Sequence, residues 1–392
     1  MTIILNGTTG ITTPDIDSTG GLDAADLTGA LPAIDGSALT NLPASGAASL
    51  NELTDCTVST VDPTPDTNPT SGLGHVWINK TTGEQYVLTD ATAGDNVWIN
   101  TASGSGDIGS IVASGGTVTY DGLYTIQTFT SSGTLTVSAG GEVEALIVGG
   151  GGGGGGRMGG GGGGGAVYTR SALNLSVGTN SITIGAGGAG GTAQAVGSTG
   201  GQTTAFGVTA DGGGGGGIYL SLAGTNGANG GGGGAPAPVA GGTGSITTYV
   251  GWTGHGGFSG GAGATYGSGG GGGASGDGEA GGTGLKAGAD GVLSAIYGTN
   301  LYWAAGGGGN SYNTGVGGDG GLGGGGGGSV STTEVTVGAG GTSGFNNGAA
   351  GILGGNGGAA GANTGSGGGG GTHSTYNGGS GGSGIVILRY LT

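Results

Sequence analysis

The most constraining feature of the sequence is the run VGGGGGGGGRMGGGGGGGA between Val148 and Ala166. Glycine has no Cβ, so a single run gains nothing from side-chain packing and loses more backbone entropy on ordering than other residues do. Further runs occur at 212–217, 230–234, 269–273, 306–309, 323–328 and 367–371. Side by side, such runs can form left-handed polyproline II rods, in which each N–H bonds a carbonyl of a neighbouring rod. We therefore expect a bundle of polyglycine II rods whose core is the glycines themselves.

The composition leaves few other classes of protein. Glycine makes up 119 of the 392 residues, while 7% of the chain is charged and 5% is aromatic. Collagen is excluded because there is no Gly-X-Y period and six of the eight prolines come before residue 70. Calcium-binding nonapeptide repeats need an Asp in each turn, and Asp319 is an isolated match. A flexible linker is the remaining alternative, but large apolar residues recur between the glycine runs.

The charge balance limits the partners of the chain. Its formal net charge is −17 with only five Lys and Arg residues, which argues against binding to nucleic acid. Cys56 is the only cysteine, so no disulfide forms within the chain. The first residues, MTIILNGTTG, lack the features of a signal peptide, and no run of about 18 apolar residues predicts insertion into a membrane.

The chain divides into four segments by composition. Residues 1–47 alternate isolated apolar residues with Gly, Pro, Asp and Ser, so this segment could not bury a hydrophobic core alone. Their spaced apolar positions suit three copies wound around one axis, with a flexible linker as the alternative: Leu27, Leu31, Ile34, Leu39 and Leu42. Residues 48–104 predict a small β module with a hairpin formed by 76–78 and 85–88, a third strand at 97–99, and Trp77 and Trp98 in its core.

Residues 105–148 predict four strands, at 117–120, 124–129, 134–137 and 142–148, because each alternates or is rich in β-branched residues. Residues 149–392 hold the glycine runs and end in a closing strand at 384–391, which we expect to pair with the first strands as the base of the bundle. A second strand pair is expected from 166–175 and 181–184. The predicted fold class is mostly β and irregular, a bundle of rods capped by strands with essentially no α-helix.

Catalytic signals are weak in this sequence. Gly257–Gly261 and Gly378–Gly382 match the nucleophile-elbow pattern, but neither lies between a long strand and a helix. His75, His255 and His373 are isolated and show no metal spacing. The carboxylates among the glycine runs could supply a glycosidase pair only if two of them faced one groove: Asp211, Asp277, Glu279, Asp290, Asp319 and Glu334. We expect no enzyme activity, no catalytic residues, no metal and no cofactor.

Aromatic residues between the runs are better candidates, for binding. Aromatic side chains have few rotamers, and their occurrence beside Gly, Ser and Asn is typical of recognition loops. The candidates are Tyr249, Trp252, His255, Phe258, Tyr266, Tyr297, Tyr302, Trp303, Tyr312, His373 and Tyr376. Trp252, His255, Phe258 and Tyr266 look like the strongest cluster. The alternative is that these rings cap the ends of the rods and exclude water.

Several segments of the sequence resemble segments of known proteins. TGALPAIDGSALTNLPA resembles the shafts of phage tail fibres, and NKTTGEQYVLTDATAGDNVW resembles a small module repeated in such fibres. FTSSGTLTV, then EALIVGGGGGG, then GGSGIVILRY resemble, over about 105–392, the glycine-rich domain of phage adhesins built as a polyglycine sandwich. Those adhesins are separate subunits on another fibre protein, whereas this chain carries its own shaft and spacer, which favours a self-contained trimeric fibre.

The resemblance implies a function at the surface of a virion. We expect a tail-fibre receptor-binding protein that recognises a bacterial glycan or outer-membrane protein through loops held by the rods. It would form a homotrimer, attach to other tail or baseplate proteins through its N-terminal segment, and be released by lysis. One alternative is a purely structural fibre, spacer or decoration protein. A less favoured alternative is an enzyme that trims surface polysaccharide.

Overall fold

The structure is a computed structural model, which describes residues 54–92, 96–101, 111–219, 222–236, 238–282, 286–312, 315–331, 336–373 and 375–391. These residues contain strands and irregular segments and no α-helix, as expected, so none of them forms a helix that could cross a membrane. The chain divides into two compact units, 1–103 and 104–392, which are described separately. The predicted shaft at 1–47 lies outside the described residues.

The first unit holds one four-stranded sheet in the order β1-β2-β3-β4. Its strands are β1 (Cys56–Ser59), β2 (Val76–Asn79), β3 (Gln85–Asp90) and β4 (Val97–Asn100). The predicted hairpin is confirmed, because Trp77 of β2 lies opposite Tyr86 of β3 in an antiparallel pair. Trp77 and Trp98 contact each other edge to face at 5.9 Å between ring centroids, but both are half-buried rather than central. Leu88, at 1% exposure, takes the interior position instead.

His75 is the buried polar centre of this first unit. One ring nitrogen, Nε2, lies 2.8 Å from Thr57 Oγ1, and the other, Nδ1, lies 2.5 Å from Ser71 Oγ. A neutral imidazole satisfies both hydroxyls, donating at one nitrogen and accepting at the other. Burial lowers the pKa of His75, and the nearby Asp55 carboxylate offsets part of that shift.

The second unit begins as a sandwich of two sheets. One is six-stranded in the order β14-β10-β9-β17-β7-β6, and the other is three-stranded in the order β11-β8-β5. The strands of the first are β6 (Thr117–Asp121), β7 (Tyr124–Phe129), β9 (Gly141–Val148), β10 (Val167–Leu175), β14 (Thr253–His255) and β17 (Ile385–Leu391). The strands of the second are β5 (Val112–Ser114), β8 (Gly133–Ala139) and β11 (Gly178–Ile182). The expected pairing of the closing strand is confirmed, since β17 lies between β9 and β7.

The expected pairing of 166–175 with 181–184 is wrong. Strand β10 pairs with β9, while β11 crosses to the other sheet and pairs with β8. The crossing buries Leu173 and Leu175 of β10 and Ile182 of β11 in one hydrophobic core between the two sheets. Burying both apolar sets between facing sheets removes more apolar surface from water than a lone hairpin would.

A second hydrophobic core covers the other face of the six-stranded sheet. It packs Leu146, Val148 and Ile387 against Trp303, which is fully buried. Trp303 belongs to the hairpin of β15 (Val292–Ser294) and β16 (Leu301–Trp303). A further two-stranded sheet is formed by β12 (Thr203–Ala205) and β13 (Val208–Ala210).

The glycine runs form the rods that the sequence predicts. Within the rod that continues β9, the N–H groups of Gly150, Gly153 and Gly156 donate to Gly201, Ser198 and Ala195, so every third residue faces the same neighbour. The intervening groups donate to two other rods, as Gly151 does to Gly382 and Gly152 does to Gly163. A three-residue period with bonds to several neighbours is the geometry of polyglycine II.

The rods pack so closely that only glycine fits at many of their contacts. A Cβ on Gly154 would overlap the carbonyl group of Gly369, and one on Gly162 would overlap that of Gly152. The glycines are therefore required for the close approach of backbones.

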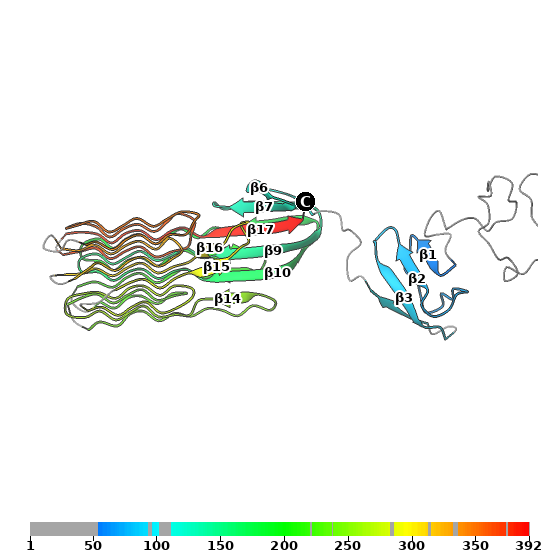
Figure 1. Ribbon diagram of the computed structural model, residues 1–392, viewed down its shortest axis with the longest axis horizontal. Helices are drawn as coiled ribbons and strands as arrows, with labels where there is room; N and C mark the ends of the chain where they lie inside the picture. The colour runs from blue at the N-terminus through cyan, green and yellow to red at the C-terminus, as the bar shows by residue number, and fades with distance from the viewer. Residues whose placement is uncertain are drawn as a thin grey trace, which may run out of the picture. The chain divides into compact units, whose positions relative to one another are not determined.

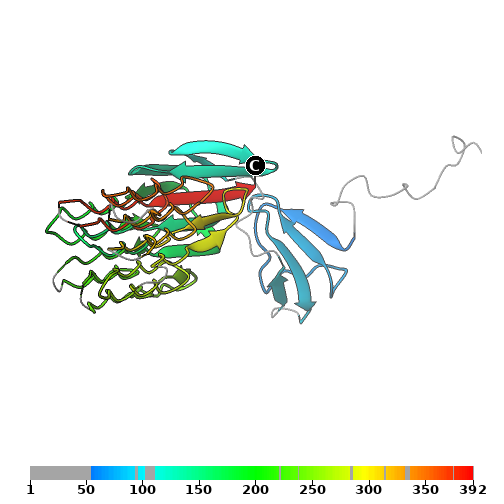
Figure 2. The same cartoon turned by 60° about the vertical axis from the view of Figure 1, so that its left-hand side comes forward.

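Both views show the rods running side by side away from the sheets of the second unit (Figures 1 and 2). The rods reverse direction, so their turns lie alternately beside the sheets and at the opposite end. We call the first group of turns the sheet end and the second group the tip. Arg157 and Met158 lie at the tip, because the rod from Gly149 to Gly156 leads there from β9.

We predict that Gly162→Ala destabilises the second unit by about 3 kcal/mol or more, because the methyl group must push rods apart. For a unit with this number of residues, such a loss of stability should lower the melting temperature by roughly 10 °C. Gly276→Ala is the matched control, since a Cβ there meets open space and its φ is not positive. Calorimetry of both variants checks this, and equal melting temperatures would contradict the close-packed rods.

We predict that the first unit loses stability as the pH falls below about 6.5, the ordinary pKa of histidine. The lowered pKa of His75 means that the unfolded chain binds this proton more readily than the folded chain. Stability is therefore full above that pH and decreases with acidification. The urea midpoint of the first unit, followed between pH 5.5 and 8 in wild type and His75→Gln, checks this. The substituted chain should show a flat profile over that range.

Candidate functional site

The rings at the sheet end mostly complete the hydrophobic cores. Tyr249 packs edge to face on Tyr168 at 5.3 Å, and its hydroxyl oxygen accepts a hydrogen bond from the Thr209 N–H. Tyr168 is itself buried, which raises its pKa to about 12. Tyr297 and Trp303 pack on Phe345 at 5.2 and 5.4 Å. These aromatic contacts belong to the two hydrophobic cores that pack on the six-stranded sheet.

The remaining sheet-side candidates are half-buried. Trp252 packs beside the core between the sheets, and His255 on β14 lies opposite Val167, where burial lowers the pKa of its imidazole. Phe258 follows in the next rod and donates its N–H to Asn229 Oδ1 at 3.2 Å. Tyr302 is half-buried on β16. The structure separates Trp252, His255 and Phe258 from Tyr266, because the rod after His255 carries the chain to the tip.

The tip gathers the other predicted rings from separate turns. Tyr312 and His373 stack with ring centroids 5.0 Å apart and an angle of 16° between planes. The Tyr312 N–H donates to the Tyr266 carbonyl at 2.8 Å, and the Tyr376 carbonyl accepts from the Arg157 N–H at 3.1 Å. Tyr266 and Tyr376 expose 44% and 38% of their surface.

Sequence reasoning missed several residues of the tip. The Arg157 guanidinium carbon lies 4.2 Å from the ring centroid of Tyr219, a cation–π contact. Met158 is buried beneath the turns and accepts a hydrogen bond from the Ala235 N–H, next to Pro236. The interruption of the longest glycine run by Arg157 and Met158 was the signal for this turn.

Side chains from several of these turns line a small hollow of about 200 Å³. Its wall is mainly aromatic and its base is apolar, formed by Met158, Tyr219, Pro236, Thr265, Tyr266, Tyr312 and His373. Flat ring faces with a few polar groups can hold an apolar side chain or the face of a sugar ring. We call this the tip pocket.

The carboxylates of the glycine-rich segment mostly bond to rods at the margin of the bundle. Asp277 accepts from the Ser259 N–H at 2.6 Å, Asp290 from Leu322 at 2.7 Å, and Asp319 from Ala339 at 2.7 Å. Glu279 likewise accepts from the Ala287 N–H at 3.1 Å. Asp211 accepts from the Gln202 side chain at 2.7 Å, while Glu334 lies outside the described residues.

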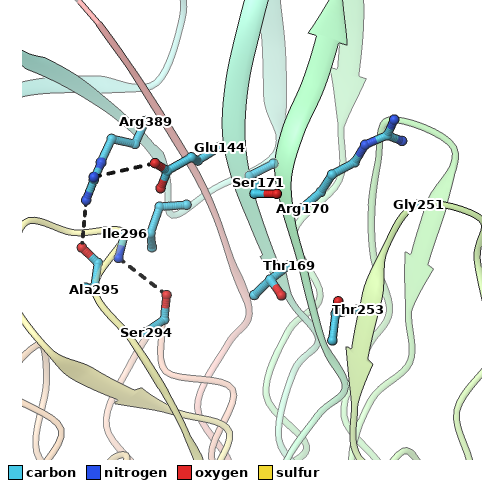
Figure 3. Close-up of a pocket in the computed structure, with 11 residues that line it drawn as sticks. Glu144, Thr169, Arg170, Ser171, Gly251, Thr253, Ser294, Ala295, Ile296 and Arg389 are labelled. Carbon is cyan, nitrogen blue, oxygen red and sulfur yellow. Dashed lines mark hydrogen bonds and ion pairs between the residues drawn. The ribbon is translucent and has the colours of Figure 1, made fainter.

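A larger cleft of about 370 Å³ lies at the sheet end (Figure 3). Its lining comes from strands β9, β10, β14 and β17 of the six-stranded sheet, from Gly251, and from the segment Ser294–Ile296 at the end of β15. On one side of it Arg389 pairs with Glu144 at 3.5 Å and donates to the Ala295 carbonyl at 3.2 Å. Arg170 leaves β10 in the direction opposite to Thr169 and Ser171 and extends toward Gly251 (Figure 3). We call this the sheet cleft.

The fold is thus a β-sandwich that continues into polyglycine rods with a ring-lined tip. A family model described as a glycine-rich domain matches residues 125–359, and the chain belongs to this family. A search of curated proteins finds no match. Within the described residues, no group of three or more His, Cys, Asp or Glu side chains is placed to hold a metal ion.

We predict that Trp303→Ala lowers the free energy of unfolding by about 3–5 kcal/mol, because it empties a fully buried site. Tyr266→Ala should change it by about 0.5 kcal/mol or less, since this exposed ring at the tip supports no core. Denaturant unfolding of both variants checks the contrast. A large loss in Tyr266→Ala would show that the tip rings serve to cap the rods.

Proposed function

We propose that this chain is the receptor-binding protein of a phage tail fibre and that it recognises the bacterial surface through its tip. The observation that carries the proposal is the gathering of partly exposed rings from separate turns around the tip pocket. The rods hold these turns by backbone hydrogen bonds, so the rings are fixed before a ligand arrives. Such preorganisation reduces the entropy that binding costs.

Exposed apolar side chains near the pocket support recognition over a purely structural rod. Leu222 and Leu353 expose 51% each, and Ile352 exposes 55%. Leu222 forms an isolated β-bridge with Ile218, which precedes the turn at Tyr219. Leu353 forms one with Val330, and Val330 forms another with Ser311, the residue before Tyr312. A spacer protein gains nothing from such a surface, whereas a binding site for a protein or glycan does.

The rest of the assignment follows from this role. The proposed protein is a homotrimer in the virion, joined to other tail or baseplate proteins through its N-terminal segment. Its receptor is a bacterial glycan or an outer-membrane protein. A polysaccharide-trimming enzyme is less favoured, because Asp277, Asp290 and Asp319 are engaged with backbone N–H groups of neighbouring rods.

We predict that a chain with both Tyr266→Ala and Tyr312→Ala binds susceptible bacteria at least tenfold more weakly than wild type. Buried aromatic anchors carry about 2 kcal/mol or more at interfaces, which corresponds to this loss. Labelled full-length chain, titrated against a panel of bacterial strains, gives the measurement. Tyr120→Ala is the matched control, because this tyrosine is 72% exposed on β6 at the sheet end.

The melting temperature of each variant must stay at the wild-type value for the comparison to hold. Equal binding by the double variant and wild type would overturn the role of the tip. Absence of binding to every strain, together with the absence of receptor-loss mutants among resistant bacteria, would favour the spacer alternative.

A further inference from the structure

The four-stranded sheet of the first unit has two faces of different kinds. Side chains alternate between the faces along each strand, and residues opposite each other on paired strands share a face. One face carries Leu88 and Trp98, which lie opposite each other on β3 and β4. The segment 60–74 covers this face, and Trp77 Nε1 donates to its Val61 carbonyl at 2.9 Å. We call this the covered face and the other one the open face.

The strand register places a set of aliphatic side chains on the open face. Val76 of β2 lies opposite both Cys56 of β1 and Val87 of β3. Val87 in turn lies opposite Ile99 of β4. With the residues two positions along each strand, the open face consists of Cys56, Val58, Val76, Ile78, Gln85, Val87, Val97 and Ile99. None of these residues is charged, and all but Gln85 are apolar.

The open face is not buried by the part of the chain that the structure describes. Val97 and Ile99 expose 49% and 51% of their surface, and the other members of the face are half-buried or exposed. The residues of the first unit that are buried belong to the covered face by the same alternation: His75, Asn79, Leu88 and Asn96. A sheet face left to solvent is ordinarily polar, so an aliphatic one indicates an interaction surface.

The size and charge of the open face favour another copy of this chain as its partner. At ordinary strand spacing, four strands of four residues present a face of about 250 Å², well below the roughly 800 Å² per partner of a stable interface between separate proteins. So small a face associates when its partners are already held together. Each chain has a formal net charge of −17, and copies can meet at this uncharged face without placing like charges against each other.

The position of this face in the sequence favours the same partner. Residues 1–47 carry the spaced apolar residues that suit three copies around one axis. Strand β1 begins at Cys56, nine residues after that segment. Nine residues reach at most about 30 Å, so copies joined through 1–47 would bring their open faces near one another.

We propose that the open face is an interface between copies of this chain, in which the aliphatic side chains of each copy pack against those of the others. This interface presupposes the homotrimer proposed above, but it is independent of the receptor-binding role of the tip. The first unit thereby helps to join the copies.

The test is sedimentation velocity of the full chain over a dilution series, beside a chain with Val87→Asp. We expect wild type to sediment as three copies. Val87→Asp should dissociate at a concentration at least tenfold higher, because it sets like charges against each other in an apolar interface. Thr70→Asp is the matched control, since it adds the same charge at an exposed position of the segment that lies on the covered face. It should dissociate as wild type does.

Two further measurements separate association from folding. Val87→Asp should keep the near-UV circular dichroism of the Trp77–Trp98 contact, because this contact lies on the covered face. Cys56 is the only cysteine of the chain and belongs to the open face. Its reaction with a thiol reagent should therefore be slower in wild type than in Val87→Asp.

Equal dissociation of wild type and Val87→Asp, with equal reactivity of Cys56, would overturn the interface. Loss of the tryptophan signal in Val87→Asp would also overturn it, because Val87 would then belong to the core of the unit. A wild-type chain that remains single at every concentration would reject the homotrimer as well. The role of the tip is tested separately, by the binding of bacterial strains.

Discussion

The hydrogen bond between neighbouring glycine rods is the interaction on which the second unit depends. Along one rod the N–H groups of Gly150, Gly151 and Gly152 donate in turn to three different neighbours. Such bonding requires each backbone to approach others from several sides, which a Cβ would prevent at positions such as Gly154. The rods therefore replace side-chain packing with backbone bonding, and the sandwich supplies the hydrophobic core that glycine cannot.

This division explains why the two ends of the bundle differ. At the sheet end the turns must cover the apolar face of the six-stranded sheet, so Trp303 and Phe345 are drawn into a core. At the tip no sheet needs covering, and rings such as Tyr266 stay partly exposed. The same residue type thus contributes to a hydrophobic core at one end and stays partly exposed at the other.

The sequence was sufficient to predict the rods, the β2–β3 hairpin and the closing strand, because each depends on a local pattern or on the two ends of one domain. It was not sufficient to assign the rings, since the end reached by a turn depends on the number of residues in every preceding rod. Trp252 and Tyr266 are close in sequence yet lie at opposite ends. The crossing of β11 to the second sheet was missed because a short connection between two strands favours a hairpin. The place of Arg157 among the tip residues was overlooked because its partner, Tyr219, is distant in the chain.

The acidic side chains along the margin of the bundle limit the addition of further rods. Polyglycine rods have no intrinsic limit in number, because every outermost N–H is a template for another rod, much as an unpaired strand is for another strand. Asp277, Asp290 and Asp319 occupy such donors with carboxylates from the same chain. They close the array chemically and give its flanks a charge that repels a second bundle. Side chains of the chain itself thereby occupy donors at which a further rod would otherwise bond.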